Sequence, residues 1–500
     1  MANQTELIVD VTKIQRAAQT GIPLSITTYT LPREMEKYIN DILSAFLREL
    51  HHEELYDYLS YCLRELAINA KKANTKRVYF QEKNLNIADP VQYEEGMKNF
   101  KMETLTNIDH YLNLQKTQGF YIKIFFQVKN NLIKLEIHNN VVLTPFEYKR
   151  IHDKIVRAEQ YSSIEETFLT EQDETEGAGL GLIIMILMLR KIGGGENSYH
   201  VETSDGETIV TVSLPLNAEI QDEFDVLSRE IVSRITDLPQ FPENILAINR
   251  LLNDPASELM KIAHYVASDP ALTADLLRLV NSSAFSLSRK CRSIHEAIKM
   301  VGIKGLKNIL YSLGSIQTLG SSTAEQRRIW NHCYKTAFYA QYLAKNFPKM
   351  HAIIDDAYVC GLLHDMGKII FSNVHPDLEG HIVSFSSARD IPKELFERLS
   401  AGINHAEIGA LIAEKWNFPD IIIQTIRFHH NPENSPEDIR MLVSVVYLAN
   451  MLTHYQEQQI EYYQFEQGIL KKLNITSEEQ IQKLLIQIQS AFEAEGIRSS

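Results

Sequence analysis

Residues 361–368 read Gly-Leu-Leu-His-Asp-Met-Gly-Lys, and an adjacent histidine and aspartate, His364 and Asp365, interrupt the apolar run. Further histidines lie before and after this pair: His332, His405, His429 and His430. Neutral imidazoles and a carboxylate that converge from several helices can bind a transition metal such as Fe, Mn or Zn, and the carboxylate can bridge two metals. The pattern therefore predicts a metal site, with a buried network of polar histidines as the alternative.

The sequence around these histidines favours helices. From residue 237 to 454 the pattern is typical of one short helix after another, with polar breaks at 253–255, 268–270 and 281–283. No strand pattern stands out here, and a Gln/Glu-rich helical tail follows at 455–500. This part of the chain is therefore predicted to be all-α.

Short motifs ahead of the histidines resemble those of one family. They lie at 238–242, 268–273, 279–283 and 293–302, and the resemblance continues through 361–368 and Trp416. These motifs are similar to those of HDOD domains, which are HD-related helical domains of bacterial signalling proteins. The resemblance implies an HDOD domain, an HD-like helical bundle, at 237–454.

The wider resemblance to the HD phosphohydrolases implies roles for individual residues. The implied metal ligands are His332, His364, Asp365, His405, His429, His430 and Asn450. Lys368 is implied to contact phosphate in catalysis. The chain departs from that superfamily where its last ligand, an aspartate, is replaced by Asn450. From the cyclic-dinucleotide phosphodiesterase branch of that superfamily, the chain also departs at Arg328, which replaces an acid, and at 431–435, which replace a Gly-Tyr-Pro loop.

The first 215 residues combine helical spacing of apolar residues with strand-like runs. Helical spacing extends over 33–73, and strand-like runs follow at 77–80, 119–128, 132–138, 201–203 and 208–214. Residues 129–131, Lys-Asn-Asn, predict a hairpin turn between two of these runs. An apolar helix is expected at 178–192. Together these features predict an α+β fold in which helices cover one face of a mostly antiparallel sheet.

Two segments in this half have the residues of a nucleotide site. Glu65 and Asn69 lie one turn apart on the predicted helix, where an acid and an amide can position a water and hold Mg²⁺. Lys72, on the adjacent face, could reach a phosphate. Closely spaced glycines, whose backbone N–H groups can bind phosphate, precede the apolar helix: Gly177, Gly179 and Gly181.

In this order, the segments resemble the GHKL ATPases and imply an α+β sandwich of the GHKL (Bergerat) type over 35–215, with ATP and Mg²⁺ as cofactors. Glu65 would then be catalytic, and Asn69, Lys72 and the three glycines would bind the nucleotide. The family's adenine-reading aspartate and its glycines are missing from 136–145. Asn139, or His138 after a shift of one residue, is the nearest substitute.

We therefore expect a multidomain protein: an N-terminal segment at 1–34, a GHKL-like domain at 35–216, a linker at 217–236, an HDOD domain at 237–454 and a helical tail at 455–500. The formal net charge of −14 argues against a nucleic-acid partner. No signal peptide is evident, and the apolar run at 179–189 is too short to span a membrane. Four scattered cysteines without CxxC spacing indicate reduced thiols in the cytoplasm.

Three hypotheses about function remain open at this point. The first is a bacterial cytoplasmic signalling regulator, in which the GHKL-like half senses a nucleotide or a partner and the HDOD half acts on a signalling protein. The second is a metal-dependent phosphohydrolase that acts on a nucleotide or cyclic dinucleotide. The third is an ATPase in the N-terminal half. A homodimer is compatible with each of them.

Overall fold

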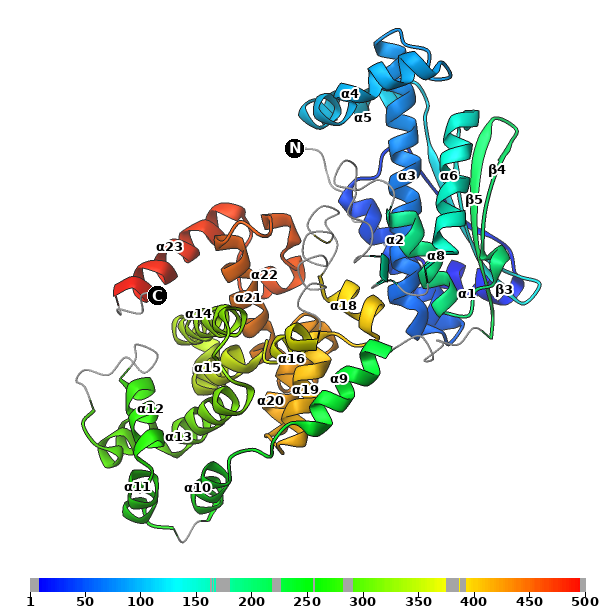
Figure 1. Ribbon diagram of the computed structural model, residues 1–500. Coiled ribbons are helices and arrows are strands. Elements are labelled where there is room, and N and C mark those ends of the chain that lie inside the picture. The colour runs from blue at the N-terminus through cyan, green and yellow to red at the C-terminus, as the bar shows by residue number, and fades with distance from the viewer. Residues whose placement is uncertain are drawn as a thin grey trace. The chain divides into compact units, whose positions relative to one another are not determined.

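The computed structural model describes residues 9–161, 164, 166–167, 180–217, 226–254, 257–281, 291–374, 386 and 393–494 (Figure 1). The chain divides into two compact units, Met1–Asp225 and Val226–Ser500. Each unit has its own core, and the two are described separately.

The first unit contains a five-stranded sheet in the order β1-β2-β3-β5-β4. Its strands are β1 Leu24–Thr28, β2 Ile122–Lys129, β3 Leu132–Asn139, β4 Tyr199–Ser204 and β5 Glu207–Pro215. All neighbouring strands are antiparallel. The hairpin predicted at 129–131 is confirmed: Asn130 and Asn131 connect β2 to β3 with φ of 55° and 61°. Asparagine tolerates this left-handed conformation, which matches the twist of a two-residue hairpin.

Helices cover one face of this sheet. The helices of this unit are α1 Val11–Thr20, α2 Arg33–Glu49, α3 Tyr56–Glu82, α4 Pro90–Thr106, α5 Ile108–Thr117, α6 Pro145–Ala158 and α8 Leu180–Lys191, with 3-10 turns at Glu53–Leu55 and Glu196–Ser198. Helices α1 and α3 contact the sheet, whereas α4 and α5 pack on α3. Every second residue is buried along β3, and along β2 as far as Phe126, as expected when one face meets the core. The coarse α+β prediction is therefore confirmed, with α3 as the long central helix of the unit (Figure 1).

Two details of the predicted secondary structure are wrong. Residues 77–80 are not a strand but lie within α3, where Val78, Tyr79 and Phe80 are all buried. Aromatic side chains from α4 and α5 surround this end of α3, and periodicity cannot distinguish a helix buried on all sides from a strand. The helix predicted at 33–73 is two helices, separated near His51, whose φ is +58°. The predicted N-terminal segment contains α1 and β1, which belong to the sheet layer.

The second unit is helical throughout its described residues. Its helices are α9 Val226–Asp237, α10 Glu243–Asn253, α11 Leu259–Ala267, α12 Pro270–Val280, α13 Ile294–Leu319, α14 Ala324–Asn346, α15 Ile354–Leu363, α16 Gly367–Val374, α18 Lys393–Ala401, α19 His405–Lys415, α20 Asp420–Phe428, α21 Arg440–Gln456, α22 Gln467–Lys472 and α23 Glu478–Ala494. Short 3-10 turns lie at Pro348–Ile353, Pro432–Asn434 and Tyr462–Gln464. The predicted breaks at 253–255 and 268–270 separate α10, α11 and α12, and α12 ends just before 281–283.

The segment assigned to a linker ends in a helix of this unit. Helix α9 packs on α16, α18 and α19. Lys415 Nζ donates hydrogen bonds to the carbonyl oxygens of Ile235 at 2.9 Å and Leu238 at 2.8 Å, near the end of α9. Trp416 Nε1 donates to the carbonyl of Pro239 at 3.1 Å. The last carbonyls of a helix have no partner within the helix, and here the Lys415 side chain, which comes from α19, satisfies them. This contact holds α9 as part of the bundle.

The C-terminal tail also packs on the bundle. Helix α23 contacts α14 and α21, and the ring of Phe492 lies 5.1 Å from that of Phe338 and 6.3 Å from that of Tyr339. None of the four cysteines forms a disulfide bond, and all four are buried. In the part of the chain that the structure describes, no helix is both long enough and apolar enough to cross a lipid bilayer.

Removing the carboxylate of Glu147 is expected to destabilise the first unit. Arg77 donates to both oxygens of Glu147, at 3.0 and 2.6 Å, and both side chains are 10% exposed. Removing one partner of a buried pair leaves an uncompensated charge and typically costs about 3–5 kcal/mol. We expect Glu147→Gln to lower the free energy of unfolding by this order, measured by urea unfolding at neutral pH. An unchanged free energy would contradict the role of this pair.

The same pair predicts a pH dependence. Burial raises the pKa of Glu147, but the hydrogen bonds and charge of Arg77 outweigh it and lower the pKa to about 2, from an ordinary 4.5. A carboxyl with a lowered pKa in the folded chain stabilises the fold above its unfolded pKa and loses this contribution as the pH falls toward its folded pKa. The loss should therefore develop between about pH 4.5 and 2. It should be smaller in Glu147→Gln, while Glu202→Gln, an exposed acid, should match the wild type.

Candidate metal centre

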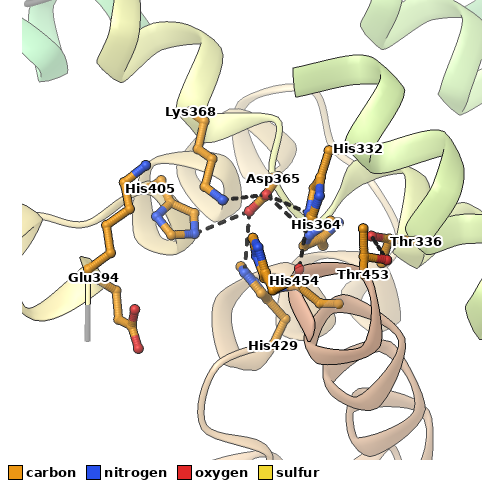
Figure 2. A network of polar contacts seen from close by, with 12 residues as sticks. His332, Thr336, His364, Asp365, Lys368, Glu394, His405, His429, Thr453 and His454 are labelled. Carbon is orange, nitrogen blue, oxygen red and sulfur yellow. Dashed lines mark hydrogen bonds and ion pairs between the residues drawn. The ribbon is translucent and has the colours of Figure 1, made fainter. Parts of the chain in front are cut away.

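The predicted metal ligands come together inside the second unit. His332 lies on α14, His364 and Asp365 in the turn between α15 and α16, and Asn450 on α21. His405 is the first residue of α19, and His429 and His430 follow the end of α20. Figure 2 shows the labelled imidazoles and Lys368 gathered around Asp365.

Asp365 is the centre of the cluster, and its side chain is 1% exposed. Its Oδ2 faces one set of residues, 3.4 Å from His332 Nε2, 3.3 Å from His364 Nε2 and 2.5 Å from Lys368 Nζ. Its Oδ1 faces a second set, 3.2 Å from His405 Nε2 and 3.5 Å from His429 Nε2. Each oxygen of the carboxylate therefore faces its own group of imidazoles.

Two more predicted residues complete these groups. His430 Nε2 lies 2.9 Å from His405 Nε2 on the Oδ1 side. Asn450 Oδ1 lies 3.0 Å from His332 Nε2 on the Oδ2 side. Among the described residues, one ligand atom each from Asp365, His405, His429 and His430 lies within 4.8 Å of the others. The same holds for His332, His364 and Asp365.

In three of the imidazoles, Nδ1, the nitrogen that points away from Asp365, makes a hydrogen bond to another group. His364 Nδ1 lies 2.8 Å from the carbonyl oxygen of Gly361, and His429 Nδ1 lies 2.7 Å from that of Ile426. A carbonyl only accepts, so both Nδ1 atoms carry the proton and both Nε2 atoms present a lone pair. His405 Nδ1 donates in the same way to the carboxylate of Glu397 at 2.5 Å.

Three of the atoms that face the centre have no hydrogen-bond partner among the described residues. His364 Nε2, His429 Nε2 and Asp365 Oδ1 are buried and unpaired in the structure. An unsatisfied buried polar atom typically costs about 1–3 kcal/mol, and lone pairs that face a carboxylate add electrostatic repulsion. A cation between them would remove both costs, so these residues fit a bound metal.

The local fold explains why His405 and Asp365 are close. A capping box holds the start of α19: Glu407 N donates to Asn404 Oδ1 at 3.0 Å, and Asn404 N donates to Glu407 Oε2 at 3.1 Å. Gly367 lies directly against this turn, where an added Cβ would overlap the carbonyl oxygen of His405. Glycine at 367 therefore permits the close contact of α16 with α19 that brings Asp365 to His405.

Electrostatics keeps most of these imidazoles in the ligating form. Burial lowers the pKa of His429 to about 4 and holds the pKa of His332 and of His430 well below the ordinary range. Burial also lowers the pKa of His405, but the Glu397 carboxylate outweighs it and raises the pKa. Neutral imidazole is the form that binds metal, so the raised pKa of His405 means that a proton competes with a metal there.

Two residues of the site were missed by the sequence analysis. Glu397, on α18, is 1% exposed and also accepts a hydrogen bond from the backbone N–H of His405 at 2.9 Å. Its position eight residues before His405 has no recognisable spacing, so no sequence signal identified it. His454 is four residues after Asn450 on α21, and its ring lies 4.8 Å from that of His332. Its helical spacing from Asn450 was a signal that could have been used.

The residues predicted to bind a nucleotide in the first unit are only partly brought together. Asn69 Nδ2 donates to Glu65 Oε1 at 3.4 Å, and an added Cβ on Gly181 would overlap the Glu65 carboxylate. Lys72 is exposed on the same helix, and Gly177 and Gly179 lie outside the described residues. Asn139 instead donates to Asn74 Oδ1 at 3.1 Å, and Asn74 lies on roughly the opposite face of α3 from Glu65.

A helical bundle that directs a His–Asp pair and further histidines toward one point defines an HD-related domain. Residues 238–432 match the HDOD domain family, so the chain contains an HDOD domain in this region. A protein of Treponema pallidum (strain Nichols), whose function is uncharacterized, is 42% identical over 491 residues, which are 98% of this chain and 96% of the relative. The alignment therefore extends over both units.

Solved structures with similarity to this chain come from other bacteria. An HDOD domain protein of unknown function from Geobacter sulfurreducens is 24% identical and aligns over 56% of this chain and 100% of its own, with a TM-score of 0.43. A protein of Shewanella amazonensis, provisionally named a metal-dependent phosphohydrolase, is 17% identical over 54% of this chain and 97% of its own, with a TM-score of 0.41. A protein of Marinobacter aquaeolei, provisionally named a signal transduction protein, is 19% identical over 61% and 77%, with a TM-score of 0.43.

Proposed function

We propose that this protein is a signal-transduction regulator whose HDOD domain binds divalent metal at Asp365 and acts on a partner protein. Fe, Mn and Zn are the candidate metals, because imidazole and carboxylate are ligands that they accept. The observation that carries the metal assignment is the set of Nε2 lone pairs, on His364, His405 and His429, that face one buried carboxylate while each Nδ1 is occupied.

The spacing of the ligand atoms also supports a metal. Two ligands at about 2.1 Å from one ion are separated by about 3.0 Å in octahedral and about 3.4 Å in tetrahedral geometry. The distances around Asp365 and His405 range from 2.9 to 3.5 Å, apart from the shorter contact with Lys368. Because each oxygen of Asp365 faces its own group of imidazoles, Asp365 and these two groups would together hold a pair of metal ions.

A specific observation favours hydrolysis as the second candidate function. Lys368 is partly buried and its Nζ contacts Asp365 Oδ2, so a cation lies at the edge of the centre where a phosphate could bind. A metal in such a site lowers the pKa of bound water and supplies a nucleophile for phosphoester hydrolysis. Asn450 argues in the other direction, because a neutral amide replaces a carboxylate at that position and compensates less of the metal's charge.

The first unit is proposed to sense a nucleotide or a partner, as a GHKL-like module. The contact of Glu65 with Asn69 and with Gly181 supports this assignment, because it joins the predicted acid, amide and glycine segment. A ligand that binds one conformation of the chain more tightly shifts the population toward that conformation, which is how such a module could control the other half.

Elemental analysis of the full-length protein, purified without chelators and without a metal-binding tag, tests the metal assignment. We expect near-stoichiometric Fe, Mn or Zn in the wild type and a marked loss in His364→Ala. Absence of metal from both proteins would contradict the assignment and leave the cluster as a polar network.

Assays of phosphodiester and cyclic-dinucleotide hydrolysis separate the two candidate functions. A metal-loaded protein without turnover supports the regulator. Robust metal-dependent turnover that is lost in Lys368→Ala would favour the enzyme and overturn the regulator as the main function.

Binding of ATP and Mg²⁺ tests the proposal for the first unit. We expect Glu65→Ala to weaken Mg-dependent binding or any hydrolysis of ATP, while Glu202→Gln, an exposed acid on β4, should not. Equal behaviour of Glu65→Ala and the wild type would remove the nucleotide assignment.

A further inference from the structure

A second group of metal-ligating side chains lies beside the Asp365 centre, at the end of α21. His454 and Glu457 are three residues apart, which places them on the same side of the helix end. His332 lies opposite on α14, which packs along α21. One ligand atom from each of these three residues lies within 4.8 Å of the other two.

The hydrogen bonds of Gln459 determine which nitrogen of His454 carries the proton. Gln459 Nε2 donates to Glu457 Oε2 at 3.1 Å, because a carboxylate can only accept. The amide oxygen of Gln459 must then be the atom 2.6 Å from His454 Nδ1, so this nitrogen donates. His454 therefore presents its lone pair on Nε2, the orientation that second-shell partners impose on metal-binding histidines.

The end of α21 holds Gln459 in this position. Gln458 adopts a left-handed φ of 56°, and the backbone N–H of Gln459 donates to the carbonyl of His454 at 3.0 Å. This turn ends the helix and brings the Gln459 side chain back over the last turn. The amide that orients His454 is thus positioned by the backbone of the same element.

This group overlaps the Asp365 centre only at His332. Among the described residues, His454 and Glu457 belong to the group with His332 and to neither group that contains Asp365. Glu457 is exposed and His454 is partly buried, so the group is open to solvent, whereas His364 and Asp365 are buried. Only His332 is shared, and it faces Asp365 and Asn450 through Nε2.

We propose that His332, His454 and Glu457 form an additional, solvent-accessible site for a divalent transition metal such as Zn²⁺, Co²⁺ or Ni²⁺. Two imidazoles and one carboxylate are a common ligand set for Zn²⁺ with an open coordination position. Lys335 Nζ, 3.2 Å from Glu457 Oε1, occupies the carboxylate when no metal is bound. We expect a metal at this site to compete with Lys335 for the Glu457 carboxylate.

Saturation of the full-length protein with Co²⁺, followed by absorption and by equilibrium dialysis, tests this site. Glu457→Gln and His454→Ala are expected to bind one equivalent less than the wild type, and Lys335→Met to bind that equivalent more tightly because the competing cation is gone. Glu461→Gln, an acid just beyond this turn, is the matched control and should keep the full stoichiometry.

The Co²⁺ experiment distinguishes the additional site from the Asp365 centre. Asp365→Ala should lose the buried metal but keep the equivalent that depends on Glu457. Equal Co²⁺ stoichiometry in the wild type, His454→Ala and Glu457→Gln would overturn the additional site, whatever the Asp365 variant shows. Because Glu457 is exposed, its replacement tests the site without disturbing the core.

Discussion

Asp365→Ala is expected to remove tightly bound metal from the HDOD domain. Asp365 is the carboxylate shared by both buried groups of ligands, so its loss deprives each group of its anion. The substitution also leaves the Lys368 ammonium, whose contact with Asp365 is 2.5 Å long, without that partner beside the centre. A cation close to the site opposes a bound dication, and in a partly buried environment this repulsion is weakly screened.

Metal content and thermal unfolding together measure this effect. Elemental analysis should find metal in the wild type and only traces in Asp365→Ala. A metal that binds the folded chain stabilises it, so chelation should lower the Tm of the wild type and leave that of the variant unchanged.

Asp356 provides the matched control for this substitution. Asp356 is another buried aspartate and lies on α15. Its carboxylate pairs with Lys304 at 2.7 Å, outside the histidine cluster. We expect Asp356→Ala to lose stability but keep its metal. Equal metal content in Asp365→Ala and Asp356→Ala would show that the metal does not depend on Asp365.

Glu397→Gln is expected to weaken metal binding about 10–100-fold without removing any ligand. Glu397 accepts from both Nδ1 and the backbone N–H of His405, and so fixes the ring and its protonation. Glutamine keeps the shape but not the charge that increases the basicity of the imidazole. Competition with a chromophoric chelator measures the loss of affinity, and Glu394→Gln, on the same helix, should have a smaller effect. No change in Glu397→Gln would contradict its role in positioning His405.

The Glu397 interaction also predicts how metal affinity varies with pH. Glu397 raises the pKa of His405, so a proton competes with the metal for Nε2. Affinity should therefore fall as the pH decreases through the pKa of His405, while His429, with a pKa lowered to about 4, stays neutral over that range. In Glu397→Gln the fall should begin at lower pH, because the pKa of His405 is no longer raised.

The sequence by itself identified the helical HDOD region and the set of residues that meet at Asp365. It could do so because the motifs at 238–302 and the order of the histidines depend on local residue types and spacing. The hairpin at Asn130 and Asn131 was likewise predictable, because its conformation depends on two residues only. The α+β character of the first unit followed from the alternation along β2 and β3.

Only the tertiary structure decided the features that depend on contacts between distant segments. The sequence of 77–80 has the pattern of a strand, but these residues lie in a helix that packs against α4 and α5. The sequence of α9 has the pattern of a linker, but Lys415 holds the end of this helix on the bundle. The protonation of His405 and His454 is determined by Glu397 and Gln459, which no motif marks. The hydrogen bond at one ring nitrogen fixes which nitrogen of a histidine presents its lone pair, and the partners that make these bonds are set by packing rather than by sequence spacing.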